Sequence, residues 1–134
     1  MEDRSEQLSP ARRSVVVFGV YLLALALALL VTPNMVLAIF AIPATQEVWI
    51  RVVGMLVGFL GYYYVRYGAG GARSFLEMTV QVRLSVPVFF LAFVLLASAP
   101  WQLMLFAVFD IVGAGWTWWS LQSASRLLAA RPQV

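Results

Sequence analysis

Long runs of apolar residues alternate with short polar connections along this chain of 134 residues. A helix needs about 20 mostly apolar residues to cross the hydrocarbon layer of a bilayer, and backbone groups in lipid must be satisfied within the segment. Four runs meet or approach this length, so each is predicted to be a helix rather than a strand. We place the four spans at about residues 14–31, 46–65, 78–97 and 102–121.

The third span is the least regular, because its uninterrupted apolar run from Leu84 onward has only 14 residues. The helix has to recruit residues that precede this run, which places Arg83 below the membrane surface. The first span stops at Thr32-Pro33, since proline cannot continue the helical hydrogen-bond ladder. Residues 33–40 are predicted to start a short new helix, with Thr32 as its N-cap and Pro33 at the first helical position.

Short connections join the spans, and loops of this length make consecutive helices antiparallel neighbours. The predicted fold is therefore all-α, a polytopic membrane protein built as an antiparallel four-helix transmembrane bundle. Residues 1–13 are predicted to form a cytoplasmic tail and residues 14–122 the transmembrane domain. Residues 123–134 are predicted to form a second cytoplasmic tail, part of which continues as a short interfacial helix.

The arginines set the expected orientation. They gather in both tails and in the second connection, whereas the first and third connections have none, so both termini are predicted to be cytoplasmic. An aromatic belt is expected at each surface, formed by Trp49, Trp101, Tyr62, Tyr63, Tyr64, Tyr67, Trp118 and Trp119. Arg12-Arg13 before an apolar run also fits a cleaved signal peptide, but the acidic residues ahead of it and the length of the run favour a retained first span.

Composition narrows the function classes. The chain is 63% apolar and 11% charged, against about 45–50% and about 25% in soluble domains. It contains no cysteine and no histidine, which excludes disulfide frameworks, thiolate zinc sites and cysteine nucleophiles, and removes the usual haem ligand and general base. We predict no cofactor, no metal site, no catalytic site and no nucleic-acid partner, since a net charge of +3 fits cytoplasmic loop charge.

Asp110 stands near the middle of the fourth span. A mid-span aspartate costs about 2.5–3.5 kcal/mol on insertion scales, so it is expected to face the bundle interior and to have a partner. Its helical stripe carries small and polar side chains, namely Ala107, Ala114, Thr117 and Leu121. Two interpretations stay open: a structural ion pair or interhelical hydrogen bond, or a carboxylate that carries a proton or binds a ligand.

Two arginines, Arg51 and Arg83, are possible partners of Asp110. At about 1.5 Å per residue, Asp110 lies about 12 Å in from the outer end of its span, and Arg51 lies about 7 Å in from the outer end of its own. Arg83 lies about 10 Å closer to the inner surface than Asp110. Arg51 is therefore the closer partner by depth. Arg51 also has a local partner in Glu47, four residues earlier, and Arg83 could instead snorkel to the inner headgroups. The excess positive charge of this polar core would suit an anionic lipid headgroup, a fatty acid or a substrate carboxylate.

A face of small residues lies on the second span. Gly54, Gly58 and Gly61 are spaced to share this face, and Gly113 adds a small residue to the fourth span. Such glycines let helices approach closely, either within the bundle or between two copies of the chain. Because Arg51 precedes Gly54 by three residues, the charge and the glycines share one face, which favours an inward orientation.

Short motifs are spread over residues 15–121: Pro33-Asn34, Ile42-Pro43-Ala44-Thr45, the run from Glu47 to Met55, Gly61-Tyr62-Tyr63-Tyr64, Arg83-Leu84, Phe89-Phe90, Asp110-x-x-Gly113-Ala114 and Trp116-Thr117. In these motifs the chain resembles a group of small bacterial membrane proteins. Its four-span layout, with a proline-bounded segment after the first span, is similar to the broad DoxX-like superfamily. The resemblance implies a four-helix bundle in a bacterial inner membrane with Arg51, Arg83 and Asp110 as its polar core. The quinone-linked sulfur oxidation of some DoxX-like proteins is not carried over, because this chain has no cysteine and no cofactor motif.

Three functional hypotheses follow. The first is a non-enzymatic accessory or scaffold subunit, with the lipid bilayer, a homo-oligomer or a larger membrane complex as its partner. The second is binding or transport of a small molecule, a lipid or a quinone through the Asp–Arg polar core, with a hydrophobic or anionic lipid-like ligand. The third, a membrane-embedded isomerase that uses Asp110 as acid and base, lacks a second convergent base.

Overall fold

The computed structural model describes residues 9–129, and it is helical with no strand among these residues. Along the chain follow helices α2 (Ser9–Val31), α3 (Pro33–Ile39), α4 (Trp49–Gly68), α5 (Arg73–Leu96) and α6 (Leu103–Ala129). The predicted all-α fold class is confirmed. Residues 1–8 and 130–134 of the two predicted tails lie outside the described residues.

Three of these helices are long and apolar enough to cross a membrane: α2, α5 and residues Leu103–Leu127 of α6. Large apolar side chains on them face outward, and Leu96 and Trp119 are 87% and 74% exposed, which suits lipid rather than water. The prediction of a membrane protein is thus supported. Helix α4 has 20 residues, but its two arginines and its tyrosine run lower its hydropathy, and it is not among the three. The predicted second span, residues 46–65, is therefore not established by length and composition, and the four-helix transmembrane bundle is not confirmed.

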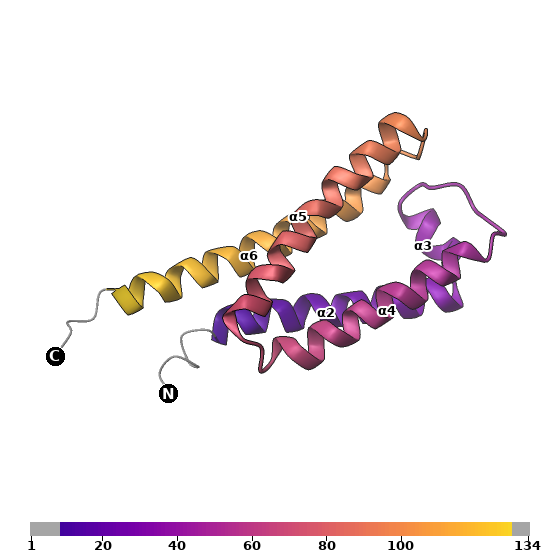
Figure 1. Cartoon of the computed structure of the whole chain (residues 1–134). Helices are drawn as coiled ribbons and strands as arrows, with labels where there is room; N and C mark the ends of the chain where they lie inside the picture. The colour runs from indigo at the N-terminus through magenta and orange to yellow at the C-terminus, as the bar shows by residue number, and fades with distance from the viewer. Residues whose placement is uncertain (1–8, 130–134) are drawn as a thin grey trace.

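The helices form two antiparallel pairs. Helix α2 packs along α4, and α5 packs along α6 (Figure 1). The pairs meet at the end of the molecule that carries the α4–α5 connection, where α2 crosses α6, and they diverge toward the α3 end (Figure 1). A buried cluster on α2, α4, α5 and α6 fills this crossing, and it comprises Ala11, Val15, Phe18, Leu22, Tyr64, Leu76, Leu121 and Ala124.

Glycines set the short distance between α2 and α4. A Cβ atom built on Gly54 would lie 2.9 Å from the Cβ of Leu29, and one built on Gly61 would lie 2.9 Å from the carbonyl oxygen of Gly19. Gly58 is less tight, since its Cβ would lie 3.3 Å from the nearest atom, the Cβ of Ala26. Because these atoms belong to α2, the glycine face of α4 is occupied within the chain.

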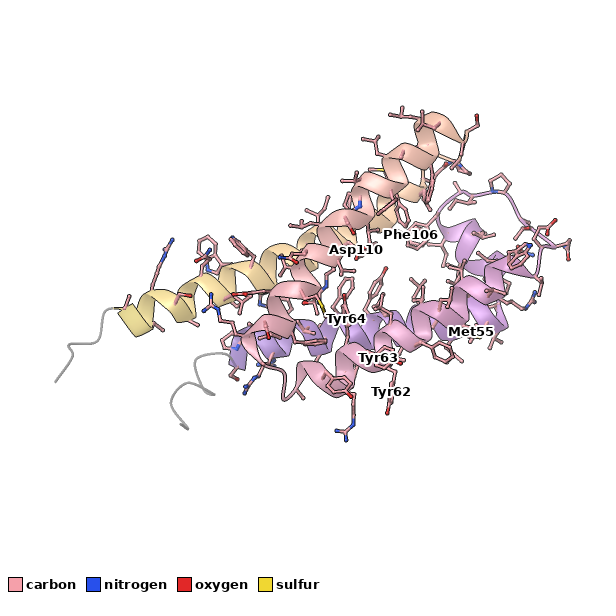
Figure 2. All side chains as sticks on the ribbon, in the orientation of Figure 1. Met55, Tyr62, Tyr63, Tyr64, Phe106 and Asp110 are labelled. Atoms are coloured by element: carbon pink, nitrogen blue, oxygen red, sulfur yellow. The ribbon has the colours of Figure 1, made fainter. Side chains whose placement is uncertain are left out.

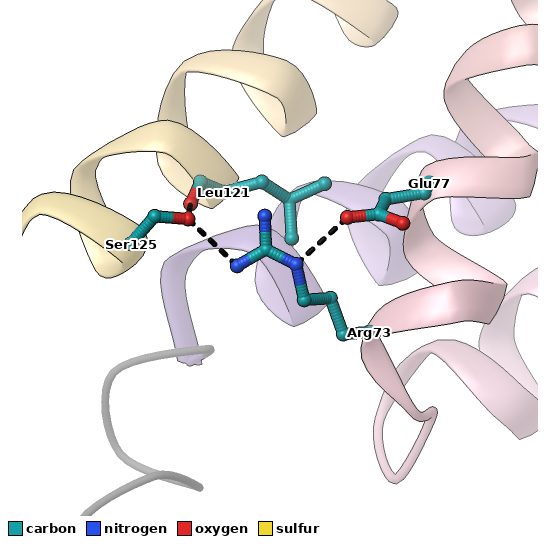
Figure 3. A network of polar contacts seen from close by, with 4 residues as sticks. All are labelled: Arg73, Glu77, Leu121 and Ser125. Atoms are coloured by element: carbon teal, nitrogen blue, oxygen red, sulfur yellow. Dashed lines mark hydrogen bonds and ion pairs between the residues drawn. The ribbon is translucent and has the colours of Figure 1, made fainter. Parts of the chain in front are cut away.

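Three helices are longer than the predicted spans, whereas α4 lies at residues 49–68 instead of the predicted 46–65. Helix α2 begins at Ser9 rather than at residue 14, α5 at Arg73 rather than at residue 78, and α6 continues through most of the predicted C-terminal tail. Polar contacts hold the early start of α5: Arg73 Nε donates to Glu77 Oε1 at 2.7 Å, and Nη1 donates to Ser125 Oγ on α6 at 2.7 Å (Figure 3). Hydropathy indicates which part of a helix lies in lipid, but the ends of the helix depend on polar contacts such as those of Arg73.

The connection between α3 and α4 is ordered by a side chain. Pro33 opens α3 after Thr32, as predicted, although the Thr32 hydroxyl donates back to the Ala28 carbonyl instead of capping α3. Asn34 pairs with the backbone of Thr45 in both directions: Nδ2 donates to the carbonyl at 3.1 Å, and Oδ1 accepts from the amide at 2.9 Å. This pairing fixes the loop that precedes α4 against α3.

Candidate functional site

Arg83 is a buried cation at the crossing of the two helix pairs. It lies on the face of α5 formed by the other buried residues of that helix, Leu76, Thr79 and Val80, at spacings of three and four residues. Its side chain is 1% exposed, so it does not snorkel to the membrane surface. A buried charge is costly unless it is paired or hydrogen-bonded, which makes its surroundings informative.

One chain of hydroxyl groups serves this cation. Arg83 Nη1 donates to Thr117 Oγ1 on α6 at 3.3 Å, and Thr117 Oγ1 lies 2.8 Å from Ser14 Oγ on α2. Ser14 Oγ also donates to the Ala11 carbonyl at 2.7 Å. Since Thr117 accepts from Arg83, its own hydrogen is available to Ser14 or to the Gly113 carbonyl, 3.0 Å away. All three helices that meet here contribute to this chain.

Two aromatic rings lie close to the guanidinium, and their centroids are 6.1 Å apart. The Cζ atom of Arg83 lies 4.0 Å from the ring centroid of Phe18 and 5.1 Å from that of Tyr64, within the range of cation–π attraction. Gly113 leaves room for Phe18 and Arg83, because a Cβ atom there would lie 2.8 Å from Phe18 Cδ2 and 3.1 Å from Arg83 Nη1. Gly113 therefore makes space for the side chains of the site and does not serve close packing between helix backbones.

Part of the guanidinium has no partner. Within the described residues, Nε and Nη2 of Arg83 are buried and make no hydrogen bond. A buried unsatisfied donor costs about 1–3 kcal/mol, and more when it is charged. Pro87, four residues after Arg83, has no N–H, so the usual helical hydrogen bond to the Arg83 carbonyl is missing.

Asp110 and Arg83 line the same cavity, which has a volume of about 260 Å³. Asp110 is half-buried, and within the described residues it makes no hydrogen bond and no ion pair, since Arg73–Glu77 is the ion pair found there. Figure 2 shows Asp110 and Phe106 on the side of the α5–α6 pair that faces α4, with Tyr64 opposite. The remaining walls are apolar and aromatic, and they include Tyr21, Leu25, Leu29, Val53, Val57, Val86 and Phe90.

Arg51 lies elsewhere. It is not among the residues that line the cavity; it is exposed, and its Nε donates to the carbonyl oxygen of Leu30 at 3.3 Å. Asn34, four residues after Leu30, belongs to α3, so this carbonyl is one of the end groups that a helix cannot satisfy by itself. The described residues contain no ion pair between Glu47 and Arg51. The structure thus brings together Arg83 and Asp110, and leaves Arg51 at the end of α2.

The sequence pattern did not predict that Tyr64 and Ser14 belong to the surroundings of Arg83. Tyr64 was expected in an interfacial belt, yet it is 4% exposed, whereas Tyr62 and Tyr63 beside it are 58% and 54% exposed. Tyr64 follows Gly61 by three residues and therefore lies on the face that packs against α2. Ser14 had a weaker signal, as a polar residue between Ala11 and Phe18 on the buried face of α2.

No group of three or more metal-binding side chains occurs in the described part of the chain. No protein-family model matches the chain, and neither the curated proteins nor the solved structures contain a match to it. The functional argument therefore rests on the geometry around Arg83 and Asp110.

Proposed function

We propose that this chain is a small integral membrane protein that binds an amphipathic molecule from the lipid phase in the cavity between its helix pairs. The polar head of that molecule would lie between Arg83 and Asp110, and its apolar part along the aromatic and aliphatic walls. We assign no catalytic step to the site. The proposal adopts the second of the hypotheses drawn from the sequence.

One observation carries the proposal. A buried cation with two nitrogens that make no hydrogen bond and a carboxylate that makes no hydrogen bond and no ion pair among the described residues border one apolar cavity. A purely structural role for the two charges would favour a closed ion pair in a filled interior, because separate charges in a low-dielectric interior are costly. Ligand sites have the opposite character, namely apolar walls and a few convergent polar groups.

We further propose that α4, the predicted second span, is also embedded in the membrane, which gives four such helices, as in the DoxX-like layout that the sequence resembles. The support is its packing: its glycines lie against α2 from Gly54 to Gly68, so the two helices share the same depth. Its outward side chains include Leu56 and Phe59, which suit lipid. Its two arginines lie near its ends, where their side chains reach the membrane surface.

The proposed orientation puts both termini on the cytoplasmic side of a bacterial inner membrane. Ser9 and Ala129, the ends of the described chain, lie at the same end of the molecule as the α4–α5 connection (Figure 1). Arginines gather at this end, and they are Arg12, Arg13, Arg66, Arg73 and Arg126. Such clustering is typical of the cytoplasmic side.

The test fills the cavity with a bulky side chain. Val86 lines the cavity, whereas Val88 on the same helix is 67% exposed, so Val86→Trp and Val88→Trp add the same bulk in two different places. Both variants and the wild type would be purified in mild detergent, and the small molecules that co-purify would be measured by native mass spectrometry. We expect a bound amphiphile in the wild type and in Val88→Trp, and its loss in Val86→Trp. Equal occupancy in all three, or none in the wild type, would contradict the proposal and favour the accessory-subunit hypothesis.

A further inference from the structure

We propose that the bound molecule is a single-chain carboxylic acid and that the Nε–Nη2 edge of Arg83 holds its carboxyl group. This inference rests on the proposed function and specifies its ligand. The guanidinium nitrogens of Arg83 differ in their hydrogen bonds. Nη1 donates to Thr117, whereas Nε and Nη2 make no hydrogen bond among the described residues.

The two unpartnered nitrogens form one edge of the planar guanidinium. Their N–H groups point the same way and match the spacing of two oxygens on one carbon, which is the bidentate arrangement found in arginine–carboxylate pairs. An alcohol or an ester carbonyl offers a single oxygen and would leave half of this edge unsatisfied. Both nitrogens are screened from solvent, so a ligand reaches them when a cavity side chain such as Tyr64 moves aside.

The charges of the cavity set the protonation of the complex. The titratable groups that face Asp110 across the cavity are Tyr21 on α2, Tyr64 on α4 and Arg83 on α5. One cation therefore faces the Asp110 carboxylate and the incoming carboxyl group together. Two ionised carboxylates at one low-dielectric site repel each other strongly, so the pair retains one proton. The acid consequently enters in its protonated form, which is also the form that dissolves in the bilayer. Its proton passes to the Asp110 carboxylate, so the bound molecule is a carboxylate with two acceptor oxygens for the Nε–Nη2 edge of Arg83.

The apolar walls fit a hydrocarbon tail. The cavity of about 260 Å³ is close to the lower end of ligand-pocket volumes, about 300 Å³, so it takes the head group and the first part of a chain. A second groove of about 360 Å³ between α4 and α5 shares Leu60, Tyr64 and Val82 with it and is lined without charged residues. We assign the rest of the tail to this groove, which borders the cavity at these three residues.

The experiment measures binding of radiolabelled dodecanoic acid to the full chain in phosphatidylcholine nanodiscs, with empty nanodiscs subtracted. Its methyl ester and dodecyl phosphate serve as competitors. We expect the unlabelled acid to compete at least about tenfold better than the ester, because a charge-assisted pair of hydrogen bonds is lost with the ester. Arg83→Lys keeps the charge and removes the bidentate edge, and it should weaken binding of the acid about tenfold. Arg51→Lys, a matched change outside the cavity, should leave binding unchanged.

The pH profile supplies a second readout that does not depend on how well a variant folds. Affinity of the wild type should fall as the pH rises from mildly acidic to mildly alkaline, since the bound pair has to keep a proton. Asp110→Asn should still bind the acid but with a weaker dependence on pH.

Acid and ester competing equally, or dodecyl phosphate competing better than the acid, would overturn the carboxylic-acid inference and leave the proposed cavity function standing. Absence of any binding would overturn the inference too. The co-purification of amphiphiles with Val86→Trp and Val88→Trp then decides the proposed function separately.

Discussion

The hydroxyl oxygen of Ser14 on α2 lies 2.8 Å from that of Thr117 on α6, and both side chains are buried. This contact joins the two helix pairs at the end where they meet. Thr117 also accepts a hydrogen bond from Arg83, so a single hydroxyl group serves both the contact between the pairs and the buried cation. The stability of the crossing and the state of the ligand site are therefore linked through Thr117.

Replacing Thr117 by valine keeps the shape of the side chain and removes this hydroxyl group. Ser14 and Arg83 then both lose a partner, and the Tyr64 hydroxyl is left as the side-chain acceptor near Arg83. We expect Thr117→Val to lower the free energy of unfolding by about 2–3 kcal/mol, because it leaves a buried charged donor unsatisfied. The measurement is unfolding in mixed micelles, followed by the helical circular dichroism signal.

Two variants calibrate this prediction. Ser14→Ala should cost only about 1 kcal/mol, since Thr117 keeps its contacts with Arg83 and with the Gly113 carbonyl. Ser123→Ala removes an exposed hydroxyl that donates to the Trp119 carbonyl on the same helix, and it should have almost no effect. If Thr117→Val behaved like Ser123→Ala, the buried chain of hydroxyl groups would contribute little to the fold.

Hydropathy and helical period predicted the helical fold, but they did not predict which helices pack against each other. Depth alone made Arg51 the nearer partner of Asp110. In the structure Arg51 does share the α2-facing side of α4 with the glycines, but α2 ends there, so its nearest acceptor is the Leu30 carbonyl. Arg83 becomes the neighbour of Asp110 because α5 and α6 pack as a pair. Which helices form pairs depends on side-chain fit over their whole length, which no local pattern encodes.

The polar stripe around Asp110 was predictable, whereas the cavity was not. Ala107, Ala114, Thr117 and Leu121 share a face by period alone, and they are buried as this predicts. A cavity forms because the two pairs diverge from their crossing, and that angle depends on how Gly113, Phe18 and Arg83 fit together. These residues come from three helices far apart in sequence.

Gly61 offers a test of the close packing between α2 and α4. A Cβ atom there would lie 2.9 Å from the backbone oxygen of Gly19, which cannot rotate away, so α4 would have to shift. We expect Gly61→Ala to destabilise the protein by about 1–3 kcal/mol, measured as a lower thermal midpoint in the same detergent. The control is Gly115→Ala, where no atom lies within 4 Å; better helix propensity should make it neutral or up to about 1 kcal/mol more stable. Equal midpoints for the two variants would contradict this packing.

Ser98 holds a strained backbone in the turn between α5 and α6. Its φ is 53°, in the left-handed region, and the amide of Ala99 after it donates to the Phe93 carbonyl at 3.1 Å, which closes the end of α5. Glycine adopts this conformation without a steric cost, so Ser98→Gly should stabilise the protein by about 0.5–1 kcal/mol. Ser98→Val should destabilise it, because a β-branched side chain tolerates this region poorly. Thermal midpoints of the two variants should fall on opposite sides of the wild type, and a lower midpoint for Ser98→Gly would rule out strain at this turn.

The connection between α3 and α4 can be tested by changing a single atom of Asn34. Asn34→Asp keeps the oxygen that accepts from the Thr45 amide and replaces Nδ2, which donates to the Thr45 carbonyl, by a second oxygen. The new carboxylate oxygen would face a carbonyl oxygen, so the pairing should break and residues 40–48 should become accessible to proteases. Thr45→Ala is the matched control, because it keeps both backbone groups and loses only a contact between the Thr45 hydroxyl and the Glu47 amide in an exposed position. Limited proteolysis in nanodiscs should therefore cleave Asn34→Asp at least several times faster than Thr45→Ala, and equal rates would show that backbone contacts alone hold this loop.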